Sequence, residues 1–129
     1  MSTANYNALA GSLLTRGRVE PDGTSVGAGV TVTEDVNVAG NTELVVMADM
    51  NGAVAGDLVP TVLPYEADNV TLMPLPLTPI TAQGPTFASG KVYYQGRFDV
   101  DAVERVQIQI KNNNAGAQTL NRASWRVAG

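Results

Sequence analysis

The sequence contains neither cysteine nor histidine among its 129 residues. Their absence excludes disulfides, thiol nucleophiles, imidazole bases and Cys/His zinc sites. An enzyme built from this chain would have to work through carboxylates alone. Glu34 and Asp35 are neighbours on a predicted strand, so their side chains point to opposite faces and do not share a substrate there. We therefore expect a protein without enzymatic activity, cofactor or metal.

Charged residues are also scarce, at 16% of the chain, and the net charge is −4. An acidic chain is a poor match for general nucleic-acid binding, so we expect no nucleic-acid partner. No apolar run approaches the 18 or so residues of a membrane span, and no membrane association is expected. The first basic residue is Arg16, too late for the basic start of a signal peptide, so synthesis in the cytoplasm without export is expected.

The few charges are distributed unevenly along the chain. Residues 19–90 contain nine acids and no Lys or Arg, whereas residues 91–129 contain six basic residues and three acids. The first 18 residues add two arginines and no acid. Either the strands mix in the fold and the asymmetry disappears in space, or it guides association with a partner or with another copy.

What the sequence has in quantity is alternation of apolar and polar residues, with many β-branched side chains. This pattern predicts short strands, over residues 30–38, 43–50, 57–63, 91–100, 105–111 and 119–127. Pro60 places the 57–63 strand at a sheet edge, since proline donates no hydrogen bond to a neighbouring strand. Residues 69–80 contain Pro74, Pro76 and Pro79 and are predicted to be extended, as an edge strand or a polyproline-like crossover. Short helices are plausible only at 4–14 or 101–105.

Seven or eight short strands separated by turn signals favour an all-β fold, an antiparallel β-sandwich of jelly-roll-like type. Within it, Val92, Tyr94, Phe98 and Val100 share one strand face and are expected in the core. The next predicted strand presents its own apolar face through Val106, Ile108 and Ile110.

Two groups of residues are candidates for ligand binding. Asp99, Asp101 and Glu104 form either a polar turn or an oxygen-ligand site for Ca²⁺. Tyr93 and Trp125 are candidates for an exposed platform that stacks on sugar rings. The alternative for this second group is that Trp125 belongs to the core and Tyr93 to a sheet edge.

The C-terminal third, residues 87–128, carries a resemblance. Its segments Lys91–Val100, Glu104–Asn112 and Thr119–Val127 resemble the closing strands of small jelly-roll-like sandwiches. Such modules occur in virion proteins of tailed bacteriophages, including capsid decoration (cement) proteins, and in carbohydrate-binding domains. The resemblance implies a non-enzymatic virion structural protein on the capsid surface, which binds the major capsid protein or another virion protein across subunit junctions. The alternatives are a carbohydrate- or receptor-binding module and a tail or connector component.

We expect an N-terminal arm over residues 1–18 and a single sandwich domain over residues 19–129. The arm is apolar, and an apolar segment in a soluble protein needs a surface that buries it. The predicted intersubunit contacts are therefore Tyr6, Leu9, Leu13, Leu14 and Arg16, followed by Arg18, Pro74, Pro76 and Pro79. A homo-oligomer is expected, with a trimer favoured.

Overall fold

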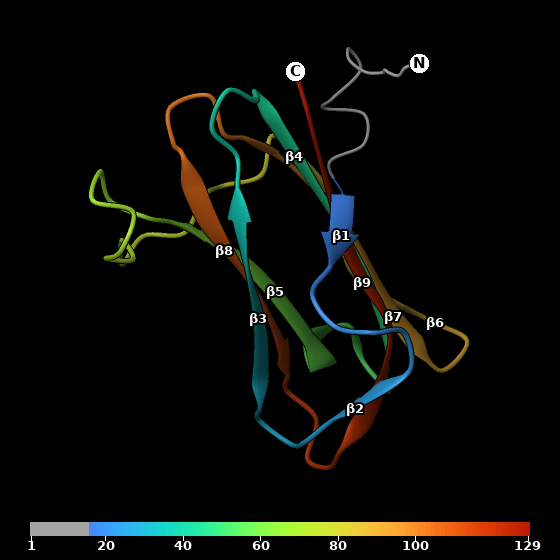
Figure 1. The fold of residues 1–129 in the computed structure, drawn as a ribbon. Coiled ribbons are helices and arrows are strands. Elements are labelled where there is room, and N and C mark those ends of the chain that lie inside the picture. The colour runs from blue at the N-terminus through green and yellow to red at the C-terminus, as the bar shows by residue number, and fades with distance from the viewer. Residues whose placement is uncertain (1–15) are drawn as a thin grey trace.

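Two antiparallel sheets pack face to face in the computed structural model, which describes residues 16–129 (Figure 1). The larger, six-stranded sheet has the order β1 (Arg16–Arg18), β9 (Gln118–Ala128), β4 (Glu43–Asn51), β7 (Lys91–Asp99) and β6 (Thr81–Ala88), with β2 (Thr24–Val26) also paired to β9. The three-stranded sheet has the order β3 (Thr31–Asn37), β8 (Arg105–Asn112) and β5 (Leu58–Pro64). The predicted all-β antiparallel sandwich is confirmed.

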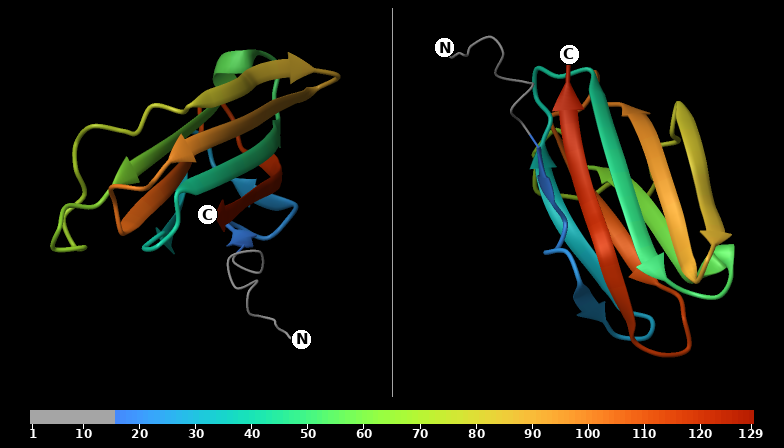
Figure 2. Two further views of the ribbon diagram at one scale, coloured as in Figure 1. Left: turned by 90° about the horizontal axis from the view of Figure 1, so that it is seen from above. Right: turned by 90° about the vertical axis from the view of Figure 1, so that its right-hand side faces the viewer.

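The two sheets are unequal in width, as Figure 2 shows from the side of the larger sheet. A jelly roll divides eight strands between two sheets. Here β6 pairs with β7, so the second sheet keeps only three strands and β6 extends the larger sheet at its edge. The jelly-roll part of the prediction remains an expectation.

The core lies between the sheets and follows the predicted alternation. Val92, Phe98 and Val100 are buried on the inner side of β7 and the turn after it, with Tyr94 between them. In β8 the buried residues are Val106, Ile108, Ile110 and Asn112, and β4 adds Leu44, Val46, Ala48 and Met50. The strand periodicity therefore predicted correctly which faces are buried.

Several local predictions are confirmed or corrected by the strand pairing. β5, which contains Pro60, is an edge strand of its sheet as expected. Residues 101–104 form a turn and not a helix, and a 3-10 helix, η2 (Ala55–Asp57), precedes β5 instead. β6 was not predicted as a strand, because its Gly84-Pro85 pair reads as loop. This pair lies at a register shift, between Gln83 and Thr86.

Residues 16–18, the last three of the expected arm, belong to the larger sheet as β1. Arg16, Gly17 and Arg18 pair with Arg126, Trp125 and Ser124 of β9. A Cβ atom on Gly17 would come within 2.8 Å of the Trp125 ring, so only glycine lets β1 approach this closely. Tyr6, Leu9, Leu13 and Leu14 lie outside the described residues.

Candidate functional site

The outer face of the six-stranded sheet, which points away from the core, carries two adjoining hollows. They have volumes of about 660 Å³ and 330 Å³. Met47, Gln95 and Arg122 line both of them. We call this continuous surface the trough; it runs from β1 across β9, β4 and β7 to β6. Small-molecule sites are usually concave pockets that bury most of the ligand, so this broad surface suits a macromolecular ligand better.

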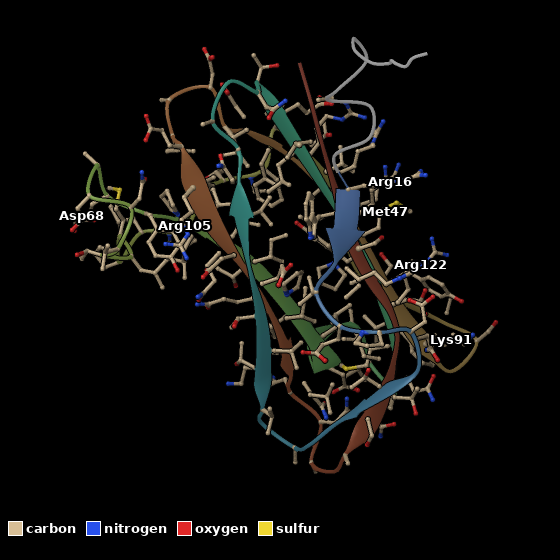
Figure 3. The ribbon with its side chains drawn as sticks, in the orientation of Figure 1. Arg16, Met47, Asp68, Lys91, Arg105 and Arg122 are labelled. Atoms are coloured by element: carbon tan, nitrogen blue, oxygen red, sulfur yellow. The ribbon has the colours of Figure 1, made fainter. Side chains whose placement is uncertain are left out.

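One end of the trough is rich in arginine, as Figure 3 shows for Arg16 and Arg122. Arg16 and Arg126 are register partners on neighbouring antiparallel strands, and both are exposed. Directly opposed side chains of this kind have Cβ atoms about 5 Å apart, and like charges there repel. Arg18 and Arg122 complete this group of four, which we call the arginine end.

Only part of this positive charge is neutralised within the fold. Arg18 lies 3.2 Å from Asp22, and Arg122 lies 4.0 Å from Asp49. For Arg16 and Arg126, no carboxylate of residues 16–129 lies within 4.0 Å. Residues 1–15 contain no Asp or Glu at all. The opposed pair is therefore the part of the trough most open to an external anion.

The other end of the trough has fewer charges: Asp49, and Arg122, which it shares with the arginine end. Tyr93 is 43% exposed there, beside Gln83, Gln95 and Thr86. Of the two aromatic candidates, Tyr93 is exposed, whereas Trp125 lines the larger hollow but is partly buried. Trp125 pairs in register with the buried Val46 and packs against the core, and its Nε1 atom is buried without a hydrogen-bond partner in the described chain.

The connection from β5 to β6 is the second prominent surface feature. It projects from the sandwich in Figure 1 and crosses from the smaller sheet to the larger one, as the crossover alternative predicted. We call residues 70–80 the proline segment. Its large apolar side chains are exposed: Val70 by 76%, Leu75 by 71%, Ile80 by 60% and Met73 by 36%. Pro74 and Pro76 are exposed as well, and Pro79 is half-buried.

The backbone of the proline segment is nevertheless held at fixed points. Met73 N–H donates to the Pro64 carbonyl at 2.9 Å, and Leu77 N–H donates to the Val62 carbonyl at 2.8 Å. Ile80 N–H donates to the Arg97 carbonyl at 2.7 Å. Its apolar side chains are thus displayed by a tethered backbone.

A polar cluster supports the start of this connection. The Arg105 guanidinium lies 4.3 Å from the Tyr65 ring centre, 2.7 Å from Asp35 Oδ2 and 2.5 Å from the Asn69 carbonyl. The Tyr65 hydroxyl donates to Asp35 Oδ1 at 2.6 Å. Desolvation raises the pKa of Asp35, but hydrogen bonds from Tyr65 and Gln107 and the Arg105 charge outweigh it, so the net pKa is lowered. The hydrogen bond to Asp35 raises the pKa of Tyr65.

Four acids lie on two segments beside this cluster, the loop after β5 and the turn before β8. Asn69 Nδ2 donates to Glu104 Oε1 at 3.0 Å, which joins the loop to the turn. We call this group the acidic lobe; its members are Glu66, Asp68, Asp101 and Glu104. Backbone hydrogen bonds from Thr71 and Val70 lower the pKa of Asp68.

The sequence raised Asp99, Asp101 and Glu104 as a possible Ca²⁺ site. Asp99 Oδ1 accepts the backbone N–H of Asp101 at 3.0 Å, while Glu104 turns to Asn69. Across residues 16–129 no three acidic side chains converge as metal ligands. In the described chain these residues therefore form the polar turn that was the alternative.

Comparison with protein-family models, curated proteins and solved structures finds no match to this chain. Over the part of the chain that the structure describes, no helix is long and apolar enough to cross a membrane. The case for a function therefore depends on the two surfaces described above.

Proposed function

We propose that the protein is a non-enzymatic virion structural protein of a tailed bacteriophage, a decoration protein that binds across capsid subunit junctions. The observation that carries this proposal is the proline segment. It holds four large apolar side chains in solvent on a tethered backbone. Exposed apolar surface of this kind is typical of protein-protein contacts.

The mechanism relies on binding energy alone. A protein that binds the assembled shell and not its separated subunits stabilises the shell by mass action. At a free concentration of about 100 times Kd this amounts to about 2.7 kcal/mol per site. Repetition over a lattice adds avidity to contacts that are individually weak.

The test is co-sedimentation of the purified chain with assembled heads of the phage that encodes it. We expect the chain to sediment with the heads and to raise their dissociation temperature. Leu75→Ser combined with Ile80→Ser should abolish both effects. Val30→Ser combined with Val54→Ser is the matched control, since these valines are 47% and 59% exposed elsewhere on the surface. A wild-type chain that remains in the supernatant contradicts the proposal, and so does normal binding by the Leu75/Ile80 variant.

A second candidate function is a carbohydrate- or receptor-binding module, which the position of Tyr93 favours. Its exposed ring lies in a trough lined by Gln83 and Gln95, which offer side-chain amides as hydrogen-bond partners. Tyr93→Ala should then remove binding on a glycan array, whereas Phe87→Ala, with 42% exposure but outside the trough, should not. Loss of binding with Tyr93→Ala and a retained melting temperature would favour this module over a decoration protein.

A further inference from the structure

The arginine end of the trough carries positive charge that the described chain does not neutralise. Arg16 and Arg126 face each other across β1 and β9, and the described chain offers neither of them a carboxylate. Opposed like charges destabilise an isolated sheet. An anionic partner would remove this cost, and arginine binds carboxylates through two parallel hydrogen bonds.

The acidic lobe has the opposite property and lies in another part of the same molecule. Figure 3 places Asp68 at one side of the molecule, with Arg16 and Arg122 at the other. The neighbouring cation, Arg105, is already paired with Asp35 at 2.7 Å. No Lys or Arg occurs between residues 19 and 90, so the loop that carries Glu66 and Asp68 has no cation of its own.

We infer that the arginine end of one copy binds the acidic lobe of a second copy. Charge complementarity between two separate surfaces of one chain produces a head-to-tail contact, because the two patches in contact are different. Such contacts close into a ring when the rotation between neighbours completes a circle, and otherwise extend as a filament. The inference is independent of capsid binding, since it concerns the purified chain alone.

Salt dependence is the first measurable consequence. Exposed ion pairs weaken when the Debye length falls, from about 30 Å at 0.01 M salt to about 3 Å at 1 M. Sedimentation velocity of the full chain should therefore show an oligomer at the low salt concentration and a single chain at the high one. A wild-type chain that is monomeric in both buffers would overturn the inference. Binding of an added anionic polymer such as polyglutamate to the arginine end would not rescue it, because the inference concerns a second copy of this chain.

Three charge-neutralising variants identify the surfaces involved. The face variant, Arg16→Gln with Arg126→Gln, alters the arginine end. The lobe variant, Glu66→Gln with Asp101→Asn, alters the acidic lobe. The side chains of Glu66 and Asp101 take part in no hydrogen bond or ion pair within residues 16–129, so the lobe variant should fold normally. The control is Lys91→Gln with Lys111→Gln, which removes the same charge as the face variant but lies outside both surfaces.

Each of the first two variants should be monomeric alone, because each lacks one half of the contact. An equimolar mixture should form a one-to-one dimer and nothing larger, since the lobe of the face variant still fits the arginine end of the lobe variant. The control should keep the wild-type mass. Wild-type mass in the face variant, or no dimer on mixing, would overturn the pairing of these two surfaces.

Discussion

Asn112 is the one fully buried polar residue in the core of the described chain, and its replacement should destabilise the fold strongly. Its Nδ2 atom donates to the carbonyls of Val26 at 2.9 Å, Gly116 at 3.1 Å and Gly27 at 3.2 Å. Its Oδ1 atom accepts from the backbone N–H and side-chain amide of Asn114, at 2.9 and 2.8 Å. One amide side chain therefore links the loop after β2 to the loop between β8 and β9.

Asn112→Ala removes these bonds and leaves their partners in place. A buried group that loses its hydrogen bond costs about 1–3 kcal/mol. The bond to Val26 is buried, whereas those to Gly27 and Gly116 are part-buried, where water can replace the lost amide. We therefore expect a loss of about 3 kcal/mol. For a chain of this length that corresponds to a decrease of roughly 10 °C in Tm.

Urea unfolding followed by fluorescence of the single tryptophan, Trp125, measures this loss directly. Asn113→Ala is the matched control, because Asn113 is exposed and its side chain donates only to the Gly56 carbonyl, at 3.2 Å. The control should lose less than about 1 kcal/mol. A loss for Asn112→Ala no larger than for Asn113→Ala would refute the reasoning, because it would mean that the buried partners find other hydrogen bonds without cost.

Asn112→Asp tests the same site through pH. An ionised carboxylate facing three carbonyl oxygens is disfavoured, so the pKa of the introduced group is raised in the folded state. The stability of this variant relative to wild type should then be greatest below the unfolded pKa of about 3.9 and fall as pH rises through the raised folded pKa. A variant whose stability relative to wild type does not change with pH would contradict this account.

Three further predictions follow from other contacts. Gly17→Ala places a Cβ atom 2.8 Å from the Trp125 ring, so it should displace β1 or the ring, shift the fluorescence maximum and cost roughly 1–3 kcal/mol by overpacking. Asp35→Asn should reduce the loss of stability that occurs at acidic pH. The pKa of Asp35 is lowered in the folded state, so its ionised carboxylate stabilises the fold above the unfolded pKa, and this contribution is lost as pH falls through the folded pKa. Arg105→Lys should lose the planar contact with the Tyr65 ring and one of the two hydrogen bonds, to Asp35 or to the Asn69 carbonyl. Amide hydrogen exchange should then accelerate in the loop after β5 but not in β4.

The core could be predicted from the sequence because buried strands carry a period of two. Apolar and polar residues alternate along β8 from Arg105 to Lys111, and β7 buries every second residue from Val92 to Phe98. The buried face is apolar except at Asn112, whose burial this periodicity does not predict. β6 carries no such signal, since seven of its eight residues are exposed. It forms because β7 offers it a free edge for pairing, and a local pattern does not contain that information.

The candidate site was less predictable for a related reason. Alternation indicates which residues share a face of one strand, but it does not give the order of strands in a sheet. Arg16 and Arg126 lie at opposite ends of the chain and meet only because β1 pairs with β9. The sequence signal that did exist was regional, an excess of basic residues in the first 18 and the last 39 positions.

Strand order also decides how much of the charge asymmetry remains in space. β4 comes from the acidic part of the chain and lies between β9 and β7, where Glu43 pairs with Arg97 and Asp49 approaches Arg122. The β4 residue opposite Arg126 is Val45, which is only 5% exposed although it lies on the outer face. Long arginine stems can cover an apolar side chain while the charged head stays in water. An apolar residue at this position leaves the head of Arg126 without an internal partner, and so the mixing of strands neutralises the middle of the sheet but not its β1 edge.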